Sequence, residues 1–379
     1  MRSVLFAALL VVGKVGAAIV PVHDGAELRA AIDEAAPGDE IVLAPGTYEI
    51  GGNLVADTPG QPDAPIVVRA AAPRSVLVKF NNPGGFAEGF RLLAPWWRIE
   101  SLDIEGACPV DSDCEHAFHL AGDADHVVIR DNHVRDFNAQ IKSNGSPQQG
   151  GGNAYPDDVL IERNVLYDTR PRQTASPVTK IDVVGGRRWI VRGNLIHDFE
   201  KGGGDTISYA AFLKGNSRDG LFEQNLVRCA WKTSGGVRLG LSLGGGGSAP
   251  DPICEEGTCT PEHQDGILRN NIVMDCSDVG IYLNEAARSS IQHNLLYGTG
   301  GIDVRFAAST ADLRNNLLQG AIRNRDGGTH TSAGDLAGIT PAQFAQWFLD
   351  PAGADFHLLD GSALVDQGVA APLVLDDFC

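Results

Sequence analysis

An asparagine that recurs ahead of a short apolar segment is the feature that most constrains the fold of this chain. Seven segments carry it, with the asparagine at residues 132, 164, 194, 225, 271, 294 and 316: RDNHV, ERNVL, RGNLI, EQNLV, RNNIV, QHNLL and RNNLL. The last two spacings are 23 and 22 residues, and the earlier ones are 32, 30, 31 and 46. A short unit that carries insertions produces such spacings, and a period of this length is typical of repeat architectures.

A short alternating segment precedes each asparagine, and glycine-rich turns follow. These segments are AFHL, QIK, TKIDVV, AFLK, GVRLGLSL, GIYLN and GIDVRF. One strand, a turn, a second short strand and another turn form one coil of a parallel β-helix, whose stacked coils share a core. Asparagine suits the tight bend because it tolerates left-handed backbone angles and its amide can bond the asparagine of the next coil. The sequence therefore predicts an all-β solenoid with a structural asparagine ladder, and the crossover rule makes it a right-handed parallel β-helix.

Both ends of the predicted stack carry signals of their own. The segment GAELRAAIDEAAPGDE predicts an amphipathic helix over residues 26–35 that covers the open end and protects its strand edges. The first residues, MRSVLFAALLVVGKVGAA, combine an early arginine, an apolar run and small residues, which is typical of a secretory signal. We therefore predict a signal peptide over residues 1–18, a single β-helix domain over residues 19–379, and a secreted protein, extracellular or periplasmic. The alternative is a plain apolar N-terminus.

Charge and hydropathy limit the partners. The formal charge is −18, with 48 acidic against 30 basic residues, so the overall field does not favour nucleic acid. Beyond the first residues, no stretch approaches the roughly 20 apolar residues of a membrane span. We expect a monomer with no nucleic-acid partner and no membrane span.

Export makes the seven cysteines candidates for disulfides. Two predicted pairs each bracket a short loop: Cys108 with Cys114, and Cys254 with Cys259. Cys229 and Cys276 follow two of the ladder asparagines by four and five residues. They either pair between neighbouring coils or remain two buried free thiols.

Alternation along the predicted strands separates core side chains from outward ones. With the apolar members placed inward, the outward side chains form one row along the stack: His119, Lys142, Lys180, Asp182, Lys214, Arg238, Tyr282, Asn284, Asp303 and Arg305. This row holds three of the seven lysines of an acidic chain. It is either a functional surface or a set of solvated side chains.

Insertions beside these strands favour a functional surface. Four of them, rich in glycine, serine and proline, are SNGSPQQGGGNAYP, TRPRQTASP, EKGGGDTIS and GGGGSAPDPICEEGTCTPEH. Loops that lengthen beside only part of the row predict the walls of a groove around that part.

A positive groove on an exported β-helix suits an acidic polysaccharide such as alginate, pectin or a glycosaminoglycan. Lyases cleave such chains by β-elimination, which needs a cation on the uronate carboxylate, a base for the C5 proton and a proton donor. We predict that Lys214 is the base, because nearby Arg238 lowers its pKa, and that Arg238 binds the carboxylate bidentately. The predicted substrate-binding residues are Lys142, Lys180, Asp182, Tyr282, Asn284, Arg305 and His263. The last is a proton carrier on the long loop unless it is merely solvated.

These residues carry two resemblances. Over residues 19 to about 369 the chain resembles the pectate-lyase-like superfamily of right-handed parallel β-helices, which implies the fold and leaves the activity open. The segment FLKGNSRDGLFEQN followed by GGVRLGLSL is similar to the chondroitinase B and alginate lyase family, in which a lysine base and an arginine lie on successive coils. That family has a calcium site formed by two glutamates just before the lysine. This chain has DTISYAAF there, so Glu200 and Asp205 are the candidate calcium ligands.

Three other functions fit the same fold. A glycoside hydrolase needs facing carboxylates, for which Asp182 and Asp205 are the candidates. A C5-epimerase shares the proton abstraction of a lyase. A non-catalytic carbohydrate-binding or surface protein keeps the groove and needs no lowered lysine pKa. The basic residues in the row favour the lyase or the epimerase over the hydrolase.

Overall fold

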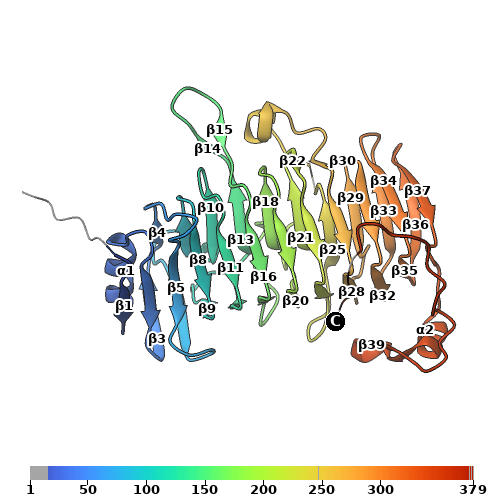
Figure 1. The fold of residues 1–379 in the computed structure, drawn as a ribbon, viewed down its shortest axis with the longest axis horizontal. Coiled ribbons are helices and arrows are strands. Elements are labelled where there is room, and N and C mark those ends of the chain that lie inside the picture. Colours follow the sequence, from blue (N-terminus) through green and yellow to red (C-terminus); the bar gives the residue numbers. More distant parts are fainter. Residues whose placement is uncertain (1–15, 246, 375, 377, 379) are drawn as a thin grey trace, which may run out of the picture.

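The computed structural model describes residues 16–245, 247–374, 376 and 378. The predicted signal peptide at residues 1–18 therefore lies outside the described residues, apart from its last three. The chain winds into an elongated stack of coils in which strands from successive coils lie side by side (Figure 1). Three long sheets run along the stack, and all the strand pairs within them are parallel. The predicted all-β, right-handed parallel β-helix is confirmed.

The strands of the three sheets follow one another in each coil. Sheet 1 contains β1 (Ile19–Val22), β2 (Glu40–Leu43), β5 (Ile66–Ala70), β8 (Trp97–Glu100), β11 (Val128–Arg130), β16 (Leu160–Glu162), β19 (Ile190–Arg192), β23 (Leu221–Glu223), β27 (Ile267–Arg269), β31 (Ser289–Gln292), β34 (Thr310–Arg314) and β37 (Thr329–Ala333). Sheet 2 contains β4 (Leu54–Ala56), β7 (Phe90–Leu92), β10 (Phe118–Ala121), β13 (Ala139–Asn144), β18 (Val178–Val184), β21 (Ile207–Lys214), β25 (Val237–Leu243), β29 (Ile281–Asn284), β33 (Gly301–Arg305) and β36 (Ala321–Arg325). Sheet 3 contains β3 (Gly46–Gly51), β6 (Val76–Asn81), β9 (Asp103–Gly106), β12 (His133–Arg135), β17 (Val165–Tyr167), β20 (Leu195–His197), β24 (Leu226–Arg228), β28 (Ile272–Met274), β32 (Leu295–Tyr297) and β35 (Leu317–Leu318).

Shorter elements decorate this stack. The small strands are β14 (Ser146–Pro147) with β15 (Asn153–Ala154), β22 (Ser217–Arg218) with β26 (His263–Gln264) and β30 (Ala286–Ala287), and β38 (Phe348–Asp350) with β39 (Asp355–Leu358). The 3-10 turns are η1 (Asp111–Asp113), η2 (Asp251–Ile253), η3 (Glu255–Gly257) and η4 (Pro351–Gly353). Helix α2 (Pro341–Trp347) packs Phe344 against aromatic side chains near the C-terminal end of the stack. No helix in the described part of the chain is both long enough and apolar enough to cross a membrane.

The asparagine ladder is present as predicted. The seven asparagines lie at the turn between the sheet 1 and sheet 3 strands of each coil, and each is at most 1% exposed. The side-chain amide of each of the first six donates to the side-chain oxygen of the next at 2.9–3.1 Å, and the amide of Asn316 donates to Oδ1 of Asp335. Buried polar groups need such partners, so the repeat is a structural device that joins consecutive coils.

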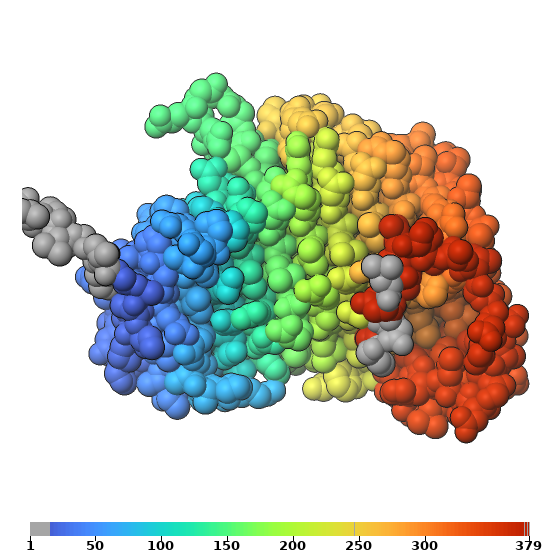
Figure 2. Space-filling view, viewed as in Figure 1, coloured from blue at the N-terminus to red at the C-terminus, as the bar shows by residue number. Residues whose placement is uncertain are grey.

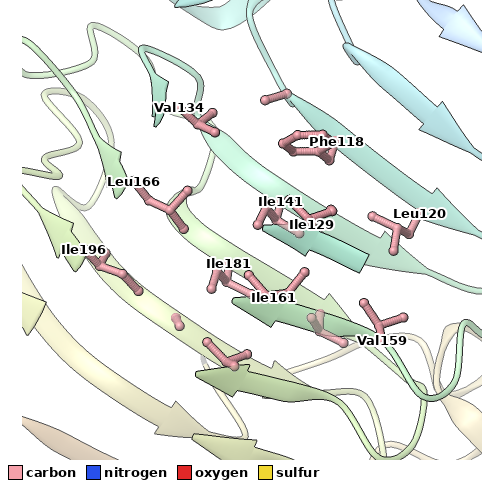
Figure 3. Close-up of a cluster of buried hydrophobic side chains, with 14 of the residues drawn as sticks. Phe118, Leu120, Ile129, Val134, Ile141, Val159, Ile161, Leu166, Ile181 and Ile196 are labelled. Atoms are coloured by element: carbon pink, nitrogen blue, oxygen red, sulfur yellow. The ribbon is translucent and has the colours of Figure 1, made fainter. Parts of the chain in front are cut away.

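The core is one continuous cluster of aliphatic and aromatic side chains inside the coils. Figure 3 shows part of it, where Ile141 and Ile181 of sheet 2 lie near Ile129 and Ile161 of sheet 1. The predicted N-terminal helix is also confirmed. Helix α1 (Gly25–Asp33) begins at a capping aspartate, buries Leu28 and Ile32, and covers the first coil (Figure 1).

Three disulfides stabilise the turns. The two predicted loop pairs, Cys108–Cys114 and Cys254–Cys259, are confirmed. Cys229 and Cys276 also pair, so the alternative of two free thiols is wrong for this structure. This third disulfide links neighbouring coils, because the two cysteines follow the paired strands β24 and β28.

A bend in sheet 2 changes which side chains point outward. The strand pairings join residue 179 with 209 and residue 181 with 211, and they skip Lys180 and Ala210 between them. Ala210 and Ala211 are both in the core, so two consecutive side chains point inward at the bend. Side chains after the bend therefore point inward and outward as simple alternation predicts, whereas side chains before the bend point the opposite way. Val237 and Leu239, predicted to point inward, instead form a small apolar cluster separate from the core.

Candidate functional site

Lys214 ends strand β21 on the outer face of sheet 2. The strand stops there because Gly215 has a φ of +71°, and a Cβ at that position would lie 2.6 Å from Cγ1 of Val184. The backbone N–H of Gly215 donates to Oε2 of Glu262 at 2.7 Å. The long loop that follows β25 is thereby tied to the end of the strand that carries Lys214.

The amine of Lys214 is not neutralised by a bonded carboxylate. Its Nζ lies 4.6 Å from the ring centroid of Phe212, and within the described residues it has no hydrogen bond or ion pair. Burial lowers the pKa of Lys214 and Lys142 lowers it further, while the carboxylates of Asp182 and Glu262 oppose this shift. The result is a lysine that gives up its proton more readily than an ordinary surface lysine.

Lys142 and Asp182 form an ion pair on the same face. They occupy matched positions on β13 and β18, and Nζ lies 2.8 Å from Oδ1. Burial alone would raise the pKa of Asp182, but Lys142 and Lys214 outweigh it and hold that pKa below its usual value. Asp182 therefore lies between two lysines: Lys142 is its ion-pair partner, and Lys214 lies beside this pair with a lowered pKa.

A second group of titratable side chains extends this face toward the N-terminal coils. His119 is level with Lys142 in the strand register. Its Nδ1 lies 3.1 Å from Oε1 of Glu88, and its Nε2 lies 2.8 Å from Oδ1 of Asn144. Burial lowers the pKa of nearby His116 to about 3, helped by His119 and Lys142, so this imidazole is neutral. Glu88, His116 and His119 each place one potential ligand atom within 4.8 Å of the others, which makes them a candidate metal cluster.

Sequence reasoning missed most of this second group. It placed His119 in the outward row without a role, and it did not select Glu88, His116 or Asn144. The H-x-x-H spacing in EHAFH was the one local signal that could have been followed. Glu88 lies one coil earlier, so only the stacking of β7 on β10 brings it to the histidines.

Lys180 does not lie on the outer face, contrary to prediction. It is 0% exposed, and its Nζ donates to Oδ2 of Asp168 at 2.6 Å and to the carbonyl of Phe137 at 2.9 Å. Lys180 stands at the bend of sheet 2, where its side chain turns inward to the corner with sheet 3. It belongs to the interior of the coil and cannot contact a ligand on the face.

Arg238 is likewise buried, at 1% exposure, so the prediction that it binds substrate beside Lys214 is wrong. Its Nη2 donates to Oε2 of Glu200 at 2.6 Å, and its Nη1 donates to the carbonyls of Cys229 and Thr233. Arg238 precedes the bend, where the alternation is reversed, and its guanidinium holds the turn between β24 and β25.

The predicted calcium ligands do not fit calcium. Glu200 is paired with Arg238, and Asp205 is paired with Lys201 and also accepts from the backbone N–H of Ile207. Each carboxylate already has a cation of its own, and calcium requires several free oxygen ligands. No step of the chemistry is therefore assigned to this pair.

The other predicted residues divide between the face and the interior. Tyr282 pairs with Ser242 on the neighbouring strand, and Ser242 pairs in turn with Phe212, so Tyr282 lies on the outer face of sheet 2. Nη1 of Arg305 donates to the hydroxyl of Tyr282 at 3.0 Å. Asn284 is level with Arg305 on the adjacent strand. His263 is fully buried, shares a 2.7 Å hydrogen bond with Ser217, and has its pKa lowered to about 3 by burial. It is neither solvated nor a proton carrier on an exposed loop.

Two of the long loops meet beyond the C-terminal ends of the sheet 2 strands. The hydroxyl of Tyr155, after the β14–β15 hairpin, donates to the carbonyl of Ile253 at 2.9 Å, and Asn153 donates to Pro252. Both segments rise from the same edge of the molecule (Figure 2). A hollow of about 700 Å³ between them is lined by five carboxylates and Arg187, and it contains none of the lysines of the face. Its acidic lining does not suit a polyanion.

Lys142, Asp182 and Lys214, with His119 at one end, are called the lysine face below. These residues lie on the outside of the adjacent strands β10, β13, β18 and β21.

Comparisons with known proteins agree with this architecture. The structure is similar to that of pectate lyase Pel9A, with 13% identity and a TM-score of 0.64, over 95% of this chain and 94% of that one. It is also similar to an alginate lyase from Paenibacillus sp. str. FPU-7, with 16% identity and a TM-score of 0.55, over 83% of this chain and 99% of that one. At these identities the likeness shows the fold. No curated protein matches the chain. The family model described as "Right handed beta helix region" matches residues 116–318, more than half of the sequence, and the chain belongs to that family.

Proposed function

We propose that the lysine face binds an acidic, uronate-containing polysaccharide and cleaves it by β-elimination. The observation that carries the proposal is Lys214, a half-buried lysine with a lowered pKa and no bonded carboxylate, beside the Lys142–Asp182 pair. A structural lysine in this chain looks different. Lys180 is paired with a buried aspartate at 2.6 Å and is sealed from solvent.

The chemistry assigns a role to each lysine. Neutral Lys214 removes the C5 proton of a bound uronate, the C5–H electrons form the C4=C5 double bond, and the C4–O4 bond breaks. Lys142 takes the part first assigned to Arg238, because its ammonium faces outward and can bind the uronate carboxylate. The proton on Lys214 can then pass to the O4 oxygen that leaves, so the lysine is neutral again when the products dissociate.

Further sugars would extend along the later coils. Tyr282, Asn284 and Arg305 continue the outer face of sheet 2 beyond Lys214. Arg305 already bonds Tyr282 and Asp326, so its guanidinium is held in place for a second carboxylate. Arg305, which is partly exposed, is the proposed contact of the outer subsite, with the buried Tyr282 and Asn284 beside it; Lys180 and His263 are not part of this subsite.

The same proposal includes export. Three disulfides are typical of proteins that mature in an oxidising compartment, and a polymeric substrate must be met outside the cytoplasm. We propose that residues 1–18 are removed during export and that residues 19–379 act as one monomeric domain.

The test is incubation of the purified protein with alginate, pectate, chondroitin sulfate and hyaluronan. Elimination produces a C4=C5 unsaturated uronate that absorbs ultraviolet light, whereas hydrolysis produces new reducing ends without this absorbance. We expect absorbance to increase with one or more of these chains. Binding without cleavage, exchange of the C5 proton without cleavage, or reducing ends without absorbance would instead establish a binding protein, an epimerase or a hydrolase.

A further inference from the structure

We propose that Glu88, His116 and His119 form a binding site for a divalent transition metal of the zinc type, at the N-terminal end of the lysine face. Glu88 precedes β7, and the two histidines flank the start of β10, the next strand of sheet 2. One ligand atom from each of the three residues lies within 4.8 Å of the other two. The stacking of two coils thus brings together two imidazoles and a carboxylate.

The ring of His116 is fixed so that one nitrogen is available. Its Nδ1 lies 3.0 Å from the carbonyl oxygen of Ala139. A carbonyl only accepts hydrogen bonds, so Nδ1 carries the hydrogen and donates it. In the neutral ring this leaves the lone pair on Nε2, which lies 3.9 Å from Oε2 of Glu115.

The ring of His119 is fixed in the opposite sense. Its Nε2 lies 2.8 Å from Oδ1 of Asn144, and the amide nitrogen of Asn144 donates to the carbonyl of Gly145 at 3.0 Å. Because that second bond orients the amide, Oδ1 accepts from Nε2–H, and Nδ1 is left facing Oε1 of Glu88 at 3.1 Å. The other oxygen of Glu88, Oε2, lies 3.1 Å from Nε of Arg91, so Oε1 is the oxygen that faces the histidines. A metal ion bound by Nδ1 and Oε1 would hold together these two facing acceptors.

Both histidines therefore have the outer contacts that metal-binding histidines require. In such sites the second ring nitrogen usually donates to a carbonyl or another oxygen acceptor, which sets the tautomer and the ring orientation. Here Ala139 and Asn144 supply these two acceptors from β13, the strand next to β10. These hydrogen bonds to Ala139 and Asn144 are a separate observation from the proximity of the three ligand atoms, and they support the same site.

The donor set selects the metal. Calcium and magnesium prefer oxygen ligands only, whereas two imidazole nitrogens with a carboxylate suit zinc and its first-row neighbours. Oε2 of Glu115 lies 3.9 Å from Nε2 of His116, at the edge of this cluster. The three ligands are partly exposed, so an ion can enter from solvent. His119 is level with Lys142 in the strand register, so the site adjoins the lysine face.

Titration calorimetry with metal alone tests the site without any substrate. Untagged protein with intact disulfides is treated with a chelator, dialysed, and titrated with Zn²⁺ and separately with Ca²⁺. We expect one zinc ion per chain and at least about tenfold weaker binding of calcium. Co²⁺ added in place of zinc should give the visible absorption of a nitrogen- and oxygen-ligated ion.

Variants decide which residues bind the ion. His116→Ala and His119→Ala should each weaken zinc binding by about 100-fold or more, and Asn144→Ala, which frees the His119 ring, by about tenfold to 100-fold. Glu88→Gln keeps the shape of the side chain and should also weaken zinc binding. It tests the site even if a histidine variant fails to fold. His133→Ala is the matched control, since this histidine lies on sheet 3 beside Arg74.

Three results would overturn the proposal: no stoichiometric zinc binding, calcium binding as tight as zinc binding, or zinc affinity unchanged in the His116, His119 and Glu88 variants. None of these results depends on cleavage of a polysaccharide. The metal site can therefore be refuted while the lyase proposal stands, and the lyase proposal can be refuted while the metal site stands.

Discussion

Replacing Lys180 tests the difference between a lysine that binds substrate and a lysine that holds the interior together. Lys180 and Asp168 are both 0% exposed and joined at 2.6 Å, and Lys180 also donates to the carbonyl of Phe137. Lys180→Met keeps the length and volume of the side chain and removes the charge. The double variant Lys180→Met/Asp168→Leu removes both charges and keeps the branched shape of the side chain at residue 168.

The two variants should differ strongly in the free energy of unfolding. Removing one partner of a buried ion pair leaves an uncompensated charge and costs about 3–5 kcal/mol. Replacing both partners by apolar groups removes that charge. Both variants leave the carbonyl of Phe137 unpaired, at about 1–3 kcal/mol, so this cost cancels when the two are compared, and the double variant also loses the attraction between Asp168 and Arg172. The double variant should therefore be more stable than Lys180→Met by about 2 kcal/mol or more.

The pH dependence gives this prediction a definite sign. Burial raises the pKa of Asp168 to about 6 even though Lys180 and Arg172 oppose it, and loss of Lys180 raises it further. A carboxyl group whose folded pKa lies above its unfolded pKa favours the folded state at low pH and loses that contribution as pH rises. Lys180→Met should therefore lose more stability, relative to the wild type, at pH 8 than at pH 5.

Urea unfolding followed by tryptophan fluorescence at both pH values measures these differences. The midpoint urea concentrations are comparable if the free energy of unfolding depends on urea concentration with the same slope in each variant. If Lys180→Met unfolded at the wild-type urea concentration and its main effect were a higher KM for the polysaccharide, Lys180 would belong to the face and the buried assignment would be wrong.

Three further predictions concern catalysis and the ladder. Lys214→Ala should lower kcat by about 100-fold or more with the fold intact, whereas Lys79→Ala, on the outer face of sheet 3, should not; equal rates would exclude Lys214 as the base. Because the reactive form of Lys214 is the neutral amine, kcat/KM should rise with pH through its lowered pKa and then level off. Asp182→Asn removes a carboxylate that raises this pKa, so the rising limb should move to lower pH; a shift to higher pH would contradict the assignment. Asn194→Ala removes Oδ1 of Asn194, the acceptor of the buried backbone N–H of Asn164, and the amide that donates to the carbonyl of Ile161, so it should cost about 3 kcal/mol or more in urea unfolding; a cost near zero would mean that the ladder is dispensable.

The sequence by itself determined the architecture, because the information is local and repeated. Each coil carries its own asparagine and its own apolar segment, and seven copies make the parallel stack the consistent solution. The capping helix and the two loop disulfides were also readable, since they depend on residues only a few positions apart. Lys142, Asp182 and Lys214 were placed correctly because their strands follow the simple alternation after the bend.

The tertiary structure decided which cations are available to a ligand. The bend at Lys180 and Ala210 puts two consecutive side chains inside. This reverses the alternation for Arg238 and turns Lys180 toward Asp168 and Arg238 toward Glu200. No short sequence pattern predicts this bend, because it lies in the strands of sheet 2 near their corner with sheet 3 and depends on how the coils stack. The cluster of Glu88 with His116 depends equally on neighbouring coils. Alternation predicts orientation only along a straight strand, and contacts between coils are set by the stack as a whole.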